Sequence, residues 1–303
     1  MNTLLFGIPR VETEFRPVEF EDIDEICSLF SRYPSPSCDY SLTGLMMWRD
    51  YYDYHIAILD DTLFIRGLDP VSGLLIYYMP SGPMDPDLIM STVRDDAGGR
   101  KAAIIGYSPE WLDIPQHADI PSCAIRMPHW DDYCYDIRQF THFEGRKMEK
   151  KRNHLNFFRN HYPDAKISPI TADDFPDICI FAQTFGKMHE DSTQFSYENS
   201  HCTDMLPVLG RNNLFGITVR IGGELIGFAY GEVIGDMFFA HVEKGNIAYR
   251  GIYQALASAM AREAERRGAG YVNREDDAGD ESLRRSKESY HPVMMVRKFL
   301  LPL

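Results

Sequence analysis

The chain lacks the features that mark several large classes of protein. Its 303 residues contain no run of about 18 apolar residues, the length that spans a membrane. The six cysteines show no Cys-x-x-Cys pair or other metal-type spacing and the ten histidines are scattered, so we expect reduced packing cysteines and no structural metal. Residues 4–8 are apolar but too few, and without a basic flank, for a signal peptide. These absences favour a cytoplasmic protein without an integral membrane segment.

Positive charge is also scarce. Lys and Arg number 31 against 45 Asp and Glu, and the net charge of −14 disfavours a protein whose whole surface binds nucleic acid. Residues 146–159 are the exception, because six basic residues there meet only one acid, Glu149, while apolar residues recur at helical spacing. We predict a basic helix that is either an anion-binding face or a solvated helix between domains. The nucleic-acid-binding candidates are Lys147, Lys150, Lys151 and Arg152.

A short repeat divides the chain into halves. Residues 17–27 match residues 169–179 at an offset of 152, in the segments PV…DIDEIC and PI…DFPDIC. Each copy is followed by the pattern of a β-hairpin, at residues 55–66 and 216–230. A length of 303 residues also predicts about two domains. The sequence therefore predicts two copies of one α/β (α+β) domain, unless the match is a pair of unrelated helix starts.

The second half has a recognisable order of predicted elements. An apolar run ends at Glu243, and a glycine turn at residues 249–251 follows it. The remaining elements are the helix 252–267, the strand 271–275, the helix 281–290 and a final strand 293–300. This order resembles the C-terminal half of the GNAT acyltransferase fold, in which a helix N-terminus after a strand holds the phosphates of coenzyme A.

The phosphate-binding motif of GNAT enzymes is only half present. That motif is Gln or Arg, two residues, Gly, one residue, then Gly or Ala. Gly251 takes the first glycine position, but Ala248 replaces the Gln or Arg, and Tyr253 crowds the backbone approach that a second small residue permits. A coenzyme A donor is therefore disfavoured, and a coenzyme A dependent N-acetyltransferase is kept as an alternative function. The cofactor-binding candidates are Arg250, Gly251, Ile252, Asn273 and Arg274.

Six short segments resemble an uncharacterised bacterial family related to the C-terminal domain of phosphatidylglycerol lysyltransferase. They are EGRK (144–147), KRN (151–153), HVEK (241–244), RGIY (250–253), NREDD (273–277) and LRRSK (283–287). Lysyltransferases and Fem-type aminoacyltransferases have two tandem GNAT-like domains, each a mixed, mostly antiparallel sheet flanked by helices. These enzymes use aminoacyl-tRNA as the donor. The resemblance thus implies tRNA as a partner and a small-molecule, lipid or peptide acceptor. We predict an N-terminal domain at 1–140, a basic connecting helix at 141–165 and a C-terminal domain at 166–303.

Acyl transfer to an amine or hydroxyl needs a base, an oxyanion stabiliser and an acid for the leaving group. By the resemblance, Glu243 matches the GNAT general base and Tyr290 the general acid, while Lys287 matches a lysine that meets the donor phosphate in Fem-type enzymes. Arg274 at the end of its strand is an anion clamp. Each has a structural alternative: Glu243 in an ion pair with a neighbouring basic residue, Tyr290 in the core, Lys287 in solvent and Arg274 in a surface ion network.

The first half offers no donor site. Residues 78–83 place two prolines, which lack N–H groups, where the phosphate-binding turn belongs. We expect aromatic side chains of this half to line the acceptor cleft, unless they belong to the hydrophobic core. The aromatic candidates are Trp48, Tyr51, Tyr52, Tyr133 and Tyr135. A third function class also stays open, a catalytically silent binding protein that kept the fold.

Overall fold

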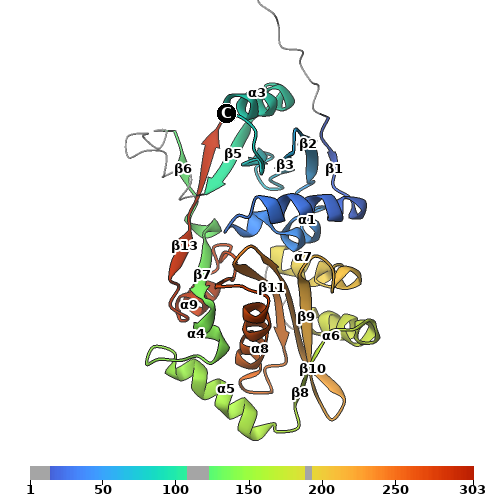
Figure 1. Cartoon of the computed structure of the whole chain (residues 1–303), viewed down its shortest axis with the longest axis vertical. Coiled ribbons are helices and arrows are strands. Elements are labelled where there is room, and N and C mark those ends of the chain that lie inside the picture. Colours follow the sequence, from blue (N-terminus) through green and yellow to red (C-terminus); the bar gives the residue numbers. More distant parts are fainter. Residues whose placement is uncertain (1–13, 108–122, 188–192) are drawn as a thin grey trace, which may run out of the picture.

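Two mixed sheets of seven strands form the body of the protein (Figure 1). The computed structural model describes residues 14–107, 123–187 and 193–303, so the apolar residues 4–8 lie outside it. The first sheet has the order β1 (Arg16–Pro17), β2 (His55–Leu59), β3 (Thr62–Leu68), β4 (Leu75–Tyr78), β5 (Ala102–Tyr107), β14 (Lys298–Pro302), β6 (Ile125–Arg126). The second has the order β8 (Lys166–Pro169), β9 (Leu214–Ile221), β10 (Glu224–Ile234), β11 (Met237–Gly245), β12 (Tyr271–Asn273), β7 (Asp132–Asp136), β13 (Met294–Val296).

Helices cover both sheets. In chain order they are α1 (Ile23–Arg32), α2 (Leu42–Met47), α3 (Pro86–Ala97), α4 (Ile137–Thr141), α5 (Glu149–His161), α6 (Phe175–Lys187), α7 (Thr193–His201), α8 (Ile252–Arg266) and α9 (Glu281–Glu288). The predicted basic helix is α5, and the predicted helices at 252–267 and 281–290 are α8 and α9. In α8 an alanine-rich stripe lies buried against β10 and β11, which fits its apolar periodicity.

The duplication is confirmed by the topology. Each sheet begins with a short strand, a hairpin and one further antiparallel strand, and its fourth and fifth strands, β4–β5 and β11–β12, are parallel. The starts of the two halves agree in detail. Asp22 and Asp174, which are 152 residues apart, each accept a backbone N–H from three residues earlier, Glu19 and Thr171, at 2.9 Å.

The two halves exchange a strand, which the sequence did not predict. β7 follows the first half in the chain but lies in the second sheet, between β12 and β13. β14 ends the chain but lies in the first sheet, between β5 and β6. The predicted single strand at 293–300 is therefore wrong, because the chain passes from one sheet to the other between β13 and β14. The boundaries predicted at 140 and 165 stay predictions.

One hydrophobic core is continuous across the halves. Buried side chains of α1 and α2 pack with those of β10 and β11, so both helices lie between the sheets (Figure 1). The other face of the second sheet is covered by α8, with α4 and α5 packed beside it. Among the described residues, no helix is long and apolar enough to cross a membrane.

Candidate active site at the splayed strands

The candidate site begins where β11 and β12 separate. Their parallel pairing ends at Phe239 and Asn273, although β11 continues to Gly245. The strand pairing of β11 with β10 skips His241, so a β-bulge bends β11 at the same level. The predicted splay of these strands is therefore present, and side chains from both of its edges meet across it.

An ion pair bridges the gap. The carboxylate of Glu243 accepts a hydrogen bond from the guanidinium of Arg274, and both side chains are largely buried. Burial opposes the charge on Arg274, but Glu243, with smaller contributions from Tyr290 and Tyr135, raises the pKa of Arg274 above its ordinary value. The guanidinium also lies 5.1 Å from the ring centroid of Tyr290 and 5.7 Å from that of Phe140. Arg274 is thus a buried cation and no part of a surface network.

Tyr290 follows α9 and lies against Arg274. Its ring stacks on Phe140 at 5.1 Å, and its hydroxyl accepts a hydrogen bond from the Gln254 amide at 3.0 Å. Burial raises the pKa of Tyr290, while Arg274 and Gln254 act in the opposite sense. The phenol therefore keeps its proton at neutral pH and is able to donate it. The structure brings Glu243, Arg274 and Tyr290 together, as the acid and base hypothesis requires.

Lys287 is buried and faces the loop that carries Arg274. Its ammonium donates hydrogen bonds to the carbonyl oxygens of Arg274, at 2.5 Å, and of Asp276. Burial lowers the pKa of Lys287, although Asp276 acts against this change. The solvated alternative is therefore wrong. In this arrangement Lys287 holds the backbone of the loop, and its predicted contact with a donor phosphate stays a prediction.

The glycine turn before α8 is covered by α5. Gly251 has φ = 91°, and a Cβ there would collide with the carbonyl oxygen of His154 and lie 3.0 Å from Cβ of Phe158. Ile252 is buried and donates its N–H to Tyr249 at 3.0 Å. The exposed Arg250 lies over the ring of Phe157, 4.6 Å from its centroid. The close backbone approach at this turn therefore serves α5.

A basic hollow of about 490 Å³ opens between α5, α8 and the chain after α9. Its charged lining residues are Arg146, Lys147, Glu149, Lys150 and Lys151, with His154 and His291 beside them. The Lys151 ammonium donates to the Ser289 hydroxyl at 2.7 Å and lies 3.7 Å from the ring centroid of Tyr290. Burial and, less, Arg274 lower the pKa of Lys151 to about 8. Because Gln254 also lines it, the hollow adjoins the Tyr290 hydroxyl.

Two further predictions differ in the structure. Arg152 does not line the hollow, since its guanidinium donates to the carbonyls of Phe143 (2.7 Å) and Gly145 (3.0 Å) and so fixes the loop before α5. Tyr133 and Tyr135 are buried within the second half and do not wall a cleft. Trp48, Tyr51 and Tyr52 are half-buried beside α7, with Trp48 stacked on Tyr197 at 5.3 Å.

A buried ionic triad that the sequence did not reveal lies on the other side of the splay. His241 places Nδ1 2.7 Å from the Glu275 carboxylate and Nε2 2.9 Å from that of Glu232. Glu232 also accepts the backbone N–H groups of Leu42 (3.2 Å) and Thr43 (2.8 Å) at the start of α2, so it joins the two halves. Burial opposes ionisation, but hydrogen bonds to the two carboxylates raise the pKa of His241 to about 9.

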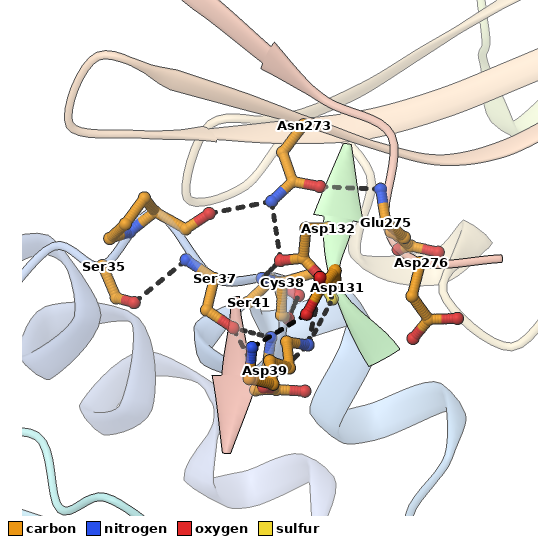
Figure 2. Close-up of polar contacts among 12 residues, drawn as sticks. Ser35, Ser37, Cys38, Asp39, Ser41, Asp131, Asp132, Asn273, Glu275 and Asp276 are labelled. Atoms are coloured by element: carbon orange, nitrogen blue, oxygen red, sulfur yellow. Dashed lines mark hydrogen bonds and ion pairs between the residues drawn. The ribbon is translucent and has the colours of Figure 1, made fainter. Parts of the chain in front are cut away.

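A second polar cluster fixes the strand exchange. The Asn273 amide donates to the Pro36 carbonyl (2.8 Å) and to Asp132 (2.9 Å), and accepts the N–H of Glu275 at 2.6 Å. Figure 2 shows Asn273 between Asp132 and Glu275. At the start of β14 the ammonium of Lys298 lies 2.9 Å from both Asp39 and Asp132. Asn273, a cofactor-binding candidate, is fully buried here, so the structure places it in the joint between the halves.

Comparisons with known proteins agree on a family and a fold. The family model described as phosphatidylglycerol lysyltransferase, C-terminal, matches residues 30–301. An uncharacterised protein of Mycoplasmoides gallisepticum is 28% identical over 171 residues, which are 56% of this chain and 55% of that protein. The chain thus spans about half the length of that relative.

Three solved structures share the architecture. A conserved protein of unknown function from Bacteroides thetaiotaomicron VPI-5482 superposes with a TM-score of 0.84 at 26% identity, over 96% of this chain and 99% of that one. L-PGS from Bacillus licheniformis has a TM-score of 0.63 at 15% identity, over 92% and 91%. FemX has a TM-score of 0.60 at 9% identity, over 96% and 97%. The fold is that of two tandem GNAT-like domains.

Proposed function

Since the chain belongs to the phosphatidylglycerol lysyltransferase C-terminal family, we propose that it transfers an aminoacyl group from aminoacyl-tRNA to an amine or hydroxyl acceptor. The observation that carries this proposal is the contact of Lys151 with Tyr290. Lys151 lines the positively charged hollow and also lies against the ring of Tyr290, the buried proton donor. An aminoacyl ester at the end of an RNA needs this combination, because its phosphates require cations and its leaving oxygen requires a proton.

The three grouped side chains have complementary tasks in such a reaction. The acceptor attacks the ester carbonyl and loses a proton to Glu243, which first has to exchange its hydrogen bond with Arg274 for one with the acceptor. Arg274 then faces the tetrahedral oxyanion. As the ester C–O bond breaks, the Tyr290 hydroxyl gives its proton to the leaving ribose oxygen. The resulting phenolate is stabilised by Arg274 and by the Gln254 amide.

One contact favours this donor over coenzyme A. The glycine turn that holds pyrophosphate in GNAT enzymes is in van der Waals contact with α5 at Gly251. A coenzyme A molecule therefore has to displace a helix, so we expect its affinity to be weaker than micromolar, which corresponds to about −8 kcal/mol.

The test compares tRNA with acetyl coenzyme A by calorimetry and measures the salt dependence of tRNA binding. Reversing the exposed Lys147 and Lys150 to Glu removes two candidate phosphate contacts, and each should lower the log–log salt slope by roughly 0.7 to 0.9. The matched control reverses Lys101 and Lys166, which are exposed on other elements. Tight binding of acetyl coenzyme A without tRNA binding would overturn the proposal in favour of an N-acetyltransferase.

A further inference from the structure

A second, smaller hollow lies along the same pair of helices. Its volume is about 130 Å³, and it opens between α5, α8 and the chain that leads into β8. Its floor is apolar and includes Leu155, Phe158, Ala255 and Ile167, while its charged residues are Arg159 and Arg262. None of these residues lines the basic hollow at the other end of α5.

The charge of this smaller hollow is uncompensated. Within residues 14–107, 123–187 and 193–303, neither Arg159 nor Arg262 has a carboxylate within ion-pair distance, whereas the nearby acid Glu263 is taken by Arg266 at 2.5 Å and by Arg267 at 2.9 Å. Burial, followed by the neighbouring Arg159 and Arg266, lowers the pKa of Arg262. Like charges held close together over an apolar floor raise the free energy of the protein unless an anion lies between them.

The chemistry of the charged groups selects a phosphate. The hollow has room for one, because its volume of about 130 Å³ is several times what a single water molecule needs. Guanidinium groups present paired N–H donors that match two oxygens of one phosphate. Two arginines without a carboxylate partner are therefore free to bind such an anion from two sides.

The position of this hollow connects it with the basic hollow. Lys151 and Arg159 are eight residues apart on α5, a separation of about 12 Å along the helix axis. An RNA backbone that runs along α5 therefore passes both hollows and brings phosphates to each of them. We propose that Arg159 and Arg262 form a second phosphate subsite, which binds the backbone of the RNA whose end enters the basic hollow. The identity of the RNA rests on the proposed function, whereas the binding of phosphate by Arg159 and Arg262 does not.

The first measurement is a thermal shift with inorganic phosphate. The double variant Arg159→Gln/Arg262→Gln should unfold at the wild-type temperature or above it in phosphate-free buffer, because the substitutions remove repulsion between like charges. Phosphate should raise the unfolding temperature of the wild type and leave that of the variant unchanged. The control, Arg94→Gln/Arg297→Gln, removes the same charge from exposed positions on other elements and should keep the wild-type response. Equal phosphate shifts in all three proteins would overturn the subsite.

The second measurement is the salt dependence of tRNA binding. Loss of two phosphate contacts should lower the log–log slope by roughly 1.4 to 1.8 in the Arg159/Arg262 variant and not in the control. An unchanged slope would overturn the assignment to RNA. The assignment would also fail if the wild type binds vesicles of mixed anionic and zwitterionic phospholipid and the variant loses this binding while it still binds tRNA. If the wild type binds no tRNA, the proposed function fails, and a phosphate shift that depends on Arg159 and Arg262 still supports the subsite.

Discussion

The stability of the protein should fall as pH rises from 6.5 to about 9, because of His241. Both nitrogens of this buried ring face carboxylates, at 2.7 and 2.9 Å, and a carboxylate accepts but does not donate. The ring is therefore held as the doubly protonated cation between Glu275 and Glu232. Replacing it by Gln in His241→Gln keeps an amide donor but removes the titrating charge.

The magnitude follows from the two pKa values. The folded protein holds the pKa of His241 at about 9, against 6.5 in an unfolded chain. At about 1.4 kcal/mol for each pH unit between them, the triad contributes about 3 kcal/mol to the free energy of unfolding. Since the folded value is the higher one, this contribution is complete below pH 6.5 and is lost as pH rises through 9. Breaking the triad at low pH should cost about 3 to 5 kcal/mol, because the buried Glu232 loses its cation together with the partly exposed Glu275.

The assay is urea unfolding of the wild type and His241→Gln at a series of pH values from 6 to 10. Other titrating groups act on both proteins, so the difference between the two curves isolates His241. We expect this difference to be large at pH 6 and to shrink by about 3 kcal/mol by pH 9 or slightly above. Parallel curves over the whole range would refute a cationic His241 and leave a neutral ring beside a protonated carboxyl.

Three other changes test the site. Tyr290→Phe should leave the unfolding temperature unchanged and lower kcat for aminoacyl transfer by about 10²- to 10⁴-fold, the usual effect of positioned proton transfer; unaltered turnover would remove the acid role. Wild-type affinity for tRNA should fall as pH rises through about 8, where Lys151 loses its proton, and Lys151→Arg should keep its affinity to pH 9; identical pH profiles would contradict this role. Gly251→Ala should lower the free energy of unfolding by more than about 1 kcal/mol, because residue 251 has a positive φ and the added Cβ collides with His154. If urea unfolding shows no loss of stability, the close contact with α5 is refuted.

The sequence predicted what local patterns determine. The repeat at offset 152 predicted two sheets of the same topology, which the structure has. The order of elements from Glu243 to Tyr290 predicted that the ends of two strands meet at a splay, where Glu243, Arg274 and Tyr290 lie together. The periodic helices were found for the same reason. The exchange of β7 and β14 was not predictable, because both strands are five residues long and pair with partners that lie far away in the sequence.

The site residues that were missed or misread depend on contacts between distant segments. Gly251 indicates a close backbone approach, but nothing in the sequence shows that α5 makes it. The triad needs Glu232, His241 and Glu275 together, and a β-bulge that turns His241 out of the regular pairing. One signal was present: Glu232 is a lone carboxylate near the end of the otherwise apolar stretch 225–234, and a buried carboxylate requires a partner.

The strand exchange determines how the chain can be divided. A fragment 166–303, cut at the predicted boundary, lacks β7, so β12 loses its antiparallel neighbour and β13 loses the strand that pairs it with the second sheet. A fragment 128–297 keeps all seven strands of that sheet and omits β14, whose partners are in the first sheet. We therefore expect 128–297 to show a cooperative urea transition and 166–303 to show a weaker one or none. Both fragments lose α1 and α2, so the shared core is exposed in each, and the comparison tests β7 together with α4 and α5, which pack against α8. Equal transitions in the two fragments would show that these three elements are dispensable, and that the boundary at residue 165 separates units that fold independently.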